Sequence, residues 1–202
     1  KAAAAATAAA VAGAATAIGA LTTKAIEGYA AQEQLVGGVE TLFKTSSDTV
    51  VGYANDAYKT AGMSANEYME TVTSFSASLL ASMNNDTAAA AEKANVAITD
   101  MSDNANKMGT DISLIQNAYN GFAKQNYTML DNLKLGYGGT KEEMQRLLDD
   151  ASKLSGIKYD ISSYSDVVDA IHVVQTEMGI TGTTAKEAST TIEGSVSSMS
   201  SA

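Results

Sequence analysis

The sequence predicts an all-α protein, folded as a compact bundle of six to eight short helices with an alanine-rich helical arm at its N-terminus. Proline, which breaks a helix from inside, is absent from all 202 residues. Apolar side chains recur at helical spacing along most of the chain, and capping signals open several of these stretches. The loops between them hold no strong strand signal.

The first two helices are expected at residues 24–36 and 49–61. Gly37 and Gly38 follow the first apolar pattern directly, and they are predicted to end that helix. Asp48 precedes the second pattern and is the expected cap of its free backbone donors.

Helix-opening signals become clearer further along the chain. Ser64 and Glu67 have the spacing of a capping box, and the helix they open is expected to run to Met83. Asp86 is the predicted cap of the next helix, which ends near Met108.

The remaining helices are punctuated by glycines and by small polar residues. Thr140 is predicted to cap a helix over residues 141–155, with Glu143 reaching back to the amide of Thr140. Thr184 and Glu187 have the same spacing at the start of the last helix. Another helix is expected from Ile112 to a break near Asn126, and a further one runs from Ser163 or Ser165 to Gly179.

Composition divides the chain at residue 44. Residues 1–44 are expected to form an alanine-rich helical arm and connector, and residues 45–202 a helical bundle domain cut from a longer polypeptide. Residues 2–23 carry no charge, and their length would span a bilayer. Alanine contributes little to membrane insertion, so three interpretations stay open: a tightly packed helix, a membrane-active segment, or a disordered arm.

The charge and the missing cysteines exclude several classes of function. A net charge of −10 with scattered lysine and arginine does not suit a protein that holds nucleic acid. Without cysteine, neither a disulfide nor a thiolate metal site can form, which fits a reducing cytoplasm.

The most distinctive stretch is residues 117–148, NAYNGFAKQNYTMLDNLKLGYGGTKEEMQRLL. It is predicted to form a helix, a glycine-rich corner and a second helix. This wording resembles the tape-measure proteins of bacteriophage tails, also described as phage minor tail proteins. The resemblance extends through residues 34–43, 58–78, 101–109, 159–162 and 170–193, so it covers roughly residues 30 to 195.

The resemblance implies a virion structural protein of a phage or prophage and no enzymatic activity. Such a protein would occupy the lumen of the tail tube, set tube length during assembly in the host cytoplasm, and leave ahead of the DNA. The implied partners are the major tail protein that forms the tube, the tail assembly chaperones, the tail-tip proteins and further copies of the chain. Related proteins often carry hydrophobic segments thought to help DNA cross the host membrane, so membrane activity of residues 2–23 is the alternative function.

Candidate chemical sites in the sequence are weak. Gly136-Tyr137-Gly138-Gly139-Thr140-Lys141 has the glycines of a phosphate-binding loop, but the order of threonine and lysine is wrong and no strand leads into it. His172 is the only histidine, and it is expected at the boundary of the core rather than in a metal site.

The acidic residues give no catalytic pattern either. Glu142-Glu143 and Asp149-Asp150 are expected on the surface of one helix, where the first pair suits the helix dipole. Asp100, Ser102 and Asn104 begin like a calcium loop, but alanine follows where that loop requires glycine. The sequence therefore predicts no catalytic residue, no cofactor site and no metal site, and a cell-wall hydrolase remains a third interpretation without a catalytic constellation.

Overall fold

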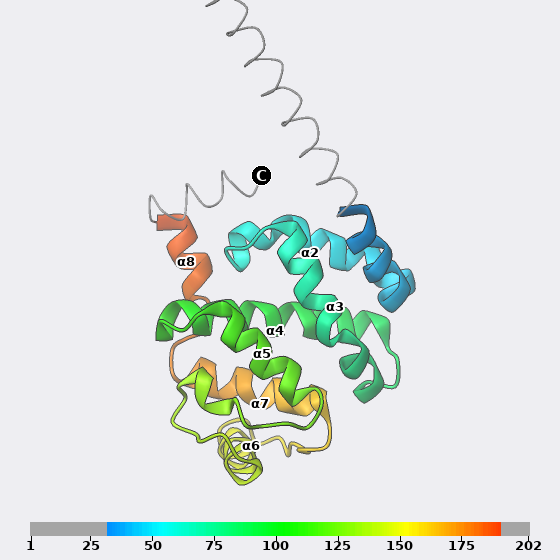
Figure 1. Cartoon of the computed structure of the whole chain (residues 1–202). Helices are drawn as coiled ribbons and strands as arrows, with labels where there is room; N and C mark the ends of the chain where they lie inside the picture. The colour runs from blue at the N-terminus through cyan, green and yellow to red at the C-terminus, as the bar shows by residue number, and fades with distance from the viewer. Residues whose placement is uncertain (1–31, 191–202) are drawn as a thin grey trace, which may run out of the picture.

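The computed structural model describes residues 32–190, and every regular element among them is helical (Figure 1). The predicted all-α bundle is confirmed for this part of the chain, which contains no strand. The alanine-rich stretch 2–23, and the start of the helix predicted at residues 24–36, lie outside the described residues.

The described helices follow one another with short connections. Residues 32–43 are helical and lead into the 3-10 turn η1. The remaining elements are η1 (Lys44–Ser46), α2 (Ser47–Thr60), α3 (Ala65–Ser82), α4 (Thr87–Met108), α5 (Ile112–Phe122), η2 (Leu130–Leu133), α6 (Lys141–Ser155), α7 (Tyr164–Glu177) and α8 (Thr183–Thr190).

Helix α4 is the centre of the bundle. It contacts α2, α3, α5, α7, α8 and both 3-10 turns, and it runs across the middle of the molecule in Figure 1. Small side chains on α4 let these neighbours approach its backbone closely. Four alanines on α4 are fully buried: Ala90, Ala91, Ala94 and Ala97.

The predicted end of the first helix at Gly37-Gly38 is wrong. The helix continues through both glycines to Phe43. A Cβ built on Gly38 would lie 3.6 Å from Thr73 Cγ2 of α3, which is an ordinary van der Waals distance, so this residue packs on α3 from within the helix instead of ending it. Val39 and Phe43, on the next turn, are fully buried in the core.

The predicted cap at Asp48 is also wrong. Helix α2 begins at Ser47, directly after η1, and Asp48 lies inside its first turn. The side chain of Ser46, at the N-cap position, makes no capping bond, but its hydroxyl lies 3.0 Å from that of Thr87. A negative charge in the first turn still suits the helix dipole.

The clearest capping predictions are confirmed. Ser64 and Glu67 form a complete capping box at the start of α3. Asp86 caps α4 through the amides of Ala88 and Ala89. Ser163, one of the two predicted residues, caps α7.

Two other capping predictions are corrected. Thr140 accepts a bond from the Glu143 amide as expected, but the Glu143 carboxylate accepts from the amide of Gly138 instead of that of Thr140. The predicted box between Thr184 and Glu187 does not form, since the Thr184 hydroxyl has no hydrogen-bond partner in the described structure.

Helix α8 is capped from another helix. Asp103 of α4 is fully buried, and its carboxylate accepts bonds from the amides of Gly182 and Thr184. These are the free donors at the start of α8, which contributes no buried residue of its own. Asp103 therefore fastens α8 to the centre of the bundle.

Candidate functional site

The glycine-rich corner at residues 136–141 is closed by side chains of α6, the helix that follows it. Glu143 Oε2 accepts a 2.9 Å bond from the amide of Gly138. A phosphate-binding loop needs such amides free to surround the phosphate. Here a carboxylate from the following helix already lies against this donor.

Arg146 completes this closure. Its guanidinium pairs with Glu143 and donates to the carbonyl of Gly136. The same group lies over the ring of Tyr137, 4.4 Å from the ring centroid, in a cation–π contact. The bond from Arg146 lowers the pKa of the half-buried Glu143 carboxyl, so the pair stays charged over the neutral range.

Gly139 fixes how closely the corner packs on the preceding loop. A Cβ built on this residue would lie 2.2 Å from the carbonyl oxygen of Thr128, which is a backbone atom that cannot rotate away. Only glycine fits this position without movement of the backbone. The corner is thus a tight structural turn.

His172 lies at the edge of the core, as predicted, but with a partner that the sequence analysis missed. Its Nδ1 is 2.9 Å from Oδ2 and 3.0 Å from Oδ1 of Asp100 on α4. The Asp100 side chain is 1% exposed and that of His172 is 38% exposed. A neighbouring ion pair between Lys93 and Asp169 also joins α4 to α7.

The pKa values of this pair are both shifted upward. The hydrogen bond to Asp100 raises the pKa of His172, while partial burial opposes this effect. Burial raises the pKa of Asp100, and the bond to His172 opposes it. The shared proton joins α4 to α7. This contact therefore has a structural role, because no nucleophilic side chain of the described residues is bonded to His172.

The calcium-like residues of α4 do not converge. Asp100 faces His172, the Ser102 hydroxyl donates to the carbonyl of Ala61, and the Asn104 amide donates to that of Leu133. Within residues 32–190, no group of three or more histidine, aspartate or glutamate side chains is arranged to hold a metal ion.

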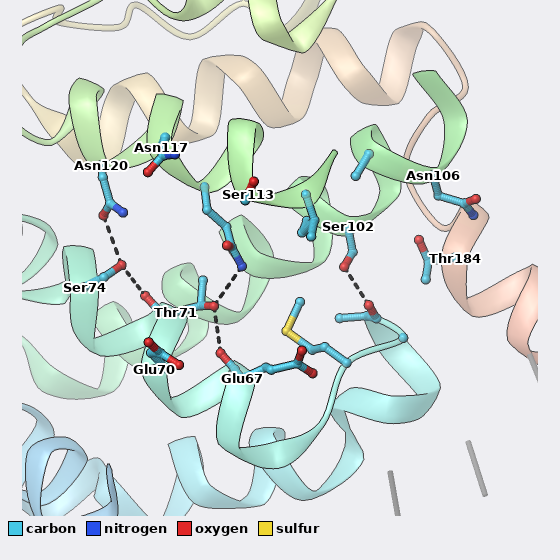
Figure 2. Close-up of a pocket in the computed structure, with 16 residues that line it drawn as sticks. Glu67, Glu70, Thr71, Ser74, Ser102, Asn106, Ser113, Asn117, Asn120 and Thr184 are labelled. Carbon is cyan, nitrogen blue, oxygen red and sulfur yellow. Dashed lines mark hydrogen bonds between the residues drawn. The ribbon is translucent and has the colours of Figure 1, made fainter. Parts of the chain in front are cut away.

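A groove with a volume of about 590 Å³ lies between α3 and α5, and both polar and apolar side chains line it (Figure 2). The opposed polar side chains of the two helices line its length, and residues of α4 and α8 lie at one end. The polar residues are Glu67, Glu70, Thr71 and Ser74 of α3, Ser113, Gln116, Asn117 and Asn120 of α5, Ser102 and Asn106 of α4, and Thr184 of α8.

Two hydrogen bonds cross this groove. The amide of Gln116 donates to the hydroxyl of Thr71 at 3.0 Å, and the hydroxyl of Ser74 donates to Oδ1 of Asn120, also at 3.0 Å. Polar residues at three- and four-residue spacing occur on both helices, which is the only signal of the groove in the sequence. That spacing does not say which helix faces which, so the sequence analysis did not find it.

No family model, curated protein or solved structure matches this chain.

Proposed function

We propose that this chain is part of a phage or prophage tail tape-measure protein and acts as a structural component without enzymatic activity. The observation that carries the proposal is the way residues 117–148 fold. The sequence of this stretch most resembles that family. Its polar groups bind one another: Glu143 accepts from the amide of Gly138, and Arg146 donates to the carbonyl of Gly136. Because these polar side chains bond backbone groups of the same corner, they are not available to bind a substrate, which suits a structural protein.

The helical architecture limits how this part could contribute to length measurement. An α-helix rises about 1.5 Å per residue, so a helical protein can measure length in proportion to its residues. Residues 32–190 would span roughly 240 Å as one straight helix. Folded as a bundle, the same number of residues has a radius of gyration of only about 15 Å. Residues 32–190 would therefore contribute little to the measured length of the tail tube. Other, extended parts of the polypeptide would determine that length.

The proposed location is the lumen of the tail tube, after assembly in the host cytoplasm. The proposed partners are the major tail protein, tail assembly chaperones, tail-tip proteins and other copies of the chain. A net charge of −10 favours sliding past DNA over binding it. We expect no gel shift with duplex DNA at ~0.15 M salt, and a persistent shift would contradict this role.

Membrane activity of residues 2–23 remains the alternative function. Those residues lie outside the described part of the chain, and no helix within residues 32–190 is long and apolar enough to cross a membrane. Dye release from liposomes by the full chain, absent in a variant without residues 1–23, would favour the alternative over the ruler.

Tail length provides the direct test. In the parent phage or prophage, deletion of residues 32–190 should shorten the tails by far less than ~240 Å, if tails still assemble. The matched control is a deletion of equal length from a part of the same protein predicted to be one continuous helix. That control should shorten the tails by about the full amount, as measured by electron microscopy.

Two results would overturn the proposal. One is absence of the protein from purified tails, measured by mass spectrometry. The other is normal tail length after deletion of the whole gene. If tails fail to form only with the 32–190 deletion, the bundle is needed for tail assembly. Tail length is then tested by the control deletion.

A further inference from the structure

We propose that the groove between α3 and α5 binds an extended polypeptide segment that carries a basic side chain. The inference does not depend on the function proposed above, because it rests only on the shape, hydrogen-bonding groups and charge of the groove. Its volume of about 590 Å³ lies within the range of sites that hold small ligands. A few residues of an extended chain are an occupant of that size.

The amide side chains of α5 offer the groups that a peptide backbone needs. The Thr71 hydroxyl has one proton, which it donates to the carbonyl of Glu67 at 2.7 Å. It must therefore accept from Gln116, so the amino group of Gln116 faces Thr71 and its carbonyl is left as an acceptor. The Ser74 hydroxyl has one proton, which is shared between the Thr71 carbonyl at 2.6 Å and Oδ1 of Asn120 at 3.0 Å, so the Asn120 amide can turn either its carbonyl or its amino group toward a bound chain.

The spacing along α5 also suits an extended chain. Ser113, Gln116 and Asn120 follow one another at intervals of three and four residues, which corresponds to a rise of about 4.5–6 Å. Alternate residues of an extended strand lie roughly 6.6 Å apart. The polar side chains of α5 are therefore spaced somewhat more closely than alternate residues of a strand, and an extended segment along α5 has a polar group within reach over its length.

The charge of the groove selects a basic side chain. Glu67 and Glu70 line it, and no lysine, arginine or histidine does. The Glu67 carboxylate accepts from the amide and hydroxyl of Ser64, whereas Glu70 is exposed and forms no ion pair in the described structure. A lysine or arginine opposite Glu70 would meet an unpaired carboxylate.

The same lining disfavours other ligand classes. Two carboxylates repel phosphate, and no aromatic ring lines the groove to stack on a base or a sugar.

The test uses the full chain and a fluorescein-labelled octapeptide of alternating serine and lysine with blocked ends. Fluorescence anisotropy should give a dissociation constant below about 1 mM at ~50 mM salt, and amide shifts in an NMR titration should cluster on α3 and α5. Glu70→Gln and Asn117→Ala should each weaken binding at least threefold. Both residues are exposed, so thermal unfolding should show that the variants keep their fold.

The matched control is Glu177→Gln, which removes one exposed carboxylate at the end of α7, outside the groove. It should leave the affinity unchanged. If this control lost as much affinity as Glu70→Gln, the effect would be due to the overall charge of the protein. That result would contradict a binding site in the groove. Undetectable binding at ~1 mM peptide, equal binding of an alternating serine–glutamate octapeptide, or full competition by spermidine at equal concentration would each overturn the peptide proposal.

Discussion

The carboxylate of Asp100 on α4 lies 2.9 Å from Nδ1 of His172 on α7, and the histidine is the more exposed partner. An isolated buried carboxylate is costly unless it is paired or protonated. His172 supplies the pairing from a position 72 residues further along the chain. The single histidine thus joins two helices of the core and makes their contact sensitive to pH.

The first prediction concerns this sensitivity. Both groups have raised pKa values in the folded protein, so the folded state holds their protons more tightly than the unfolded chain. The stabilisation by His172 is therefore fully present below its ordinary pKa of 6.5 and is lost as pH rises through the higher folded-state value. Urea unfolding between about pH 5.5 and 8.5 should show stability falling with pH.

His172→Asn is the matched variant for that measurement. Asparagine places an amide donor near the position of Nδ1 but does not titrate, so the part of the pH dependence due to His172 should disappear. His172→Ala should cost about 1–3 kcal/mol at pH 6, because it leaves Asp100 without this partner. An unchanged pH dependence in the asparagine variant would show that other groups cause it.

The second prediction concerns the glycine-rich corner. Gly139→Ala should lower the free energy of unfolding by about 1–3 kcal/mol, because its Cβ would lie 2.2 Å from the Thr128 carbonyl oxygen. Gly138→Ala is the control, since its Cβ would meet Glu143 Cγ at an ordinary 3.5 Å. Both changes restrict the unfolded chain equally, so the difference reports the clash. Equal effects in urea unfolding would contradict the tight packing.

Most of the helices could be predicted from the sequence because their signals are local. The box of Ser64 and Glu67, the cap at Asp86 and the apolar spacing all act within a few residues. The end predicted at Gly37 and Gly38 was wrong because a glycine pair occurs both at the end of a helix and inside one. The helix continues to Val39 and Phe43, and their burial depends on distant parts of the chain that local sequence does not show.

The candidate site could not be predicted for the same reason. Gln116 and Thr71 are 45 residues apart, and Asp103 lies 81 residues from Thr184. A polar residue at helical spacing is equally consistent with a solvated face and with one wall of a groove. Whether α3 faces α5 depends on how the whole bundle packs, and local sequence does not show it.

The third prediction tests the cap that crosses from α4 to α8. Asp103→Ala removes the acceptor of two backbone amides, Gly182 and Thr184, and should cost about 1–2 kcal/mol. Trypsin should then cleave faster after Lys186, the lysine within α8. Asp111→Ala is the control, because Asp111 caps α5. Unchanged cleavage at Lys186 in Asp103→Ala would show that other contacts hold α8.

The last prediction concerns where the folded bundle begins. A chain without residues 1–23 should unfold as cooperatively as the full chain, with nearly the same helicity per residue, because residues 2–23 are mostly alanine and have little apolar side chain to bury. A chain without residues 1–44 loses Val39 and Phe43, both fully buried. Removing a buried phenylalanine alone costs about 3–5 kcal/mol. We therefore expect a large drop in the melting temperature, measured by circular dichroism, only for the shorter chain. Equal melting of the two truncated chains would place the start of the bundle at residue 45, and melting of the whole domain without residues 1–23 would make the alanine-rich stretch part of the core.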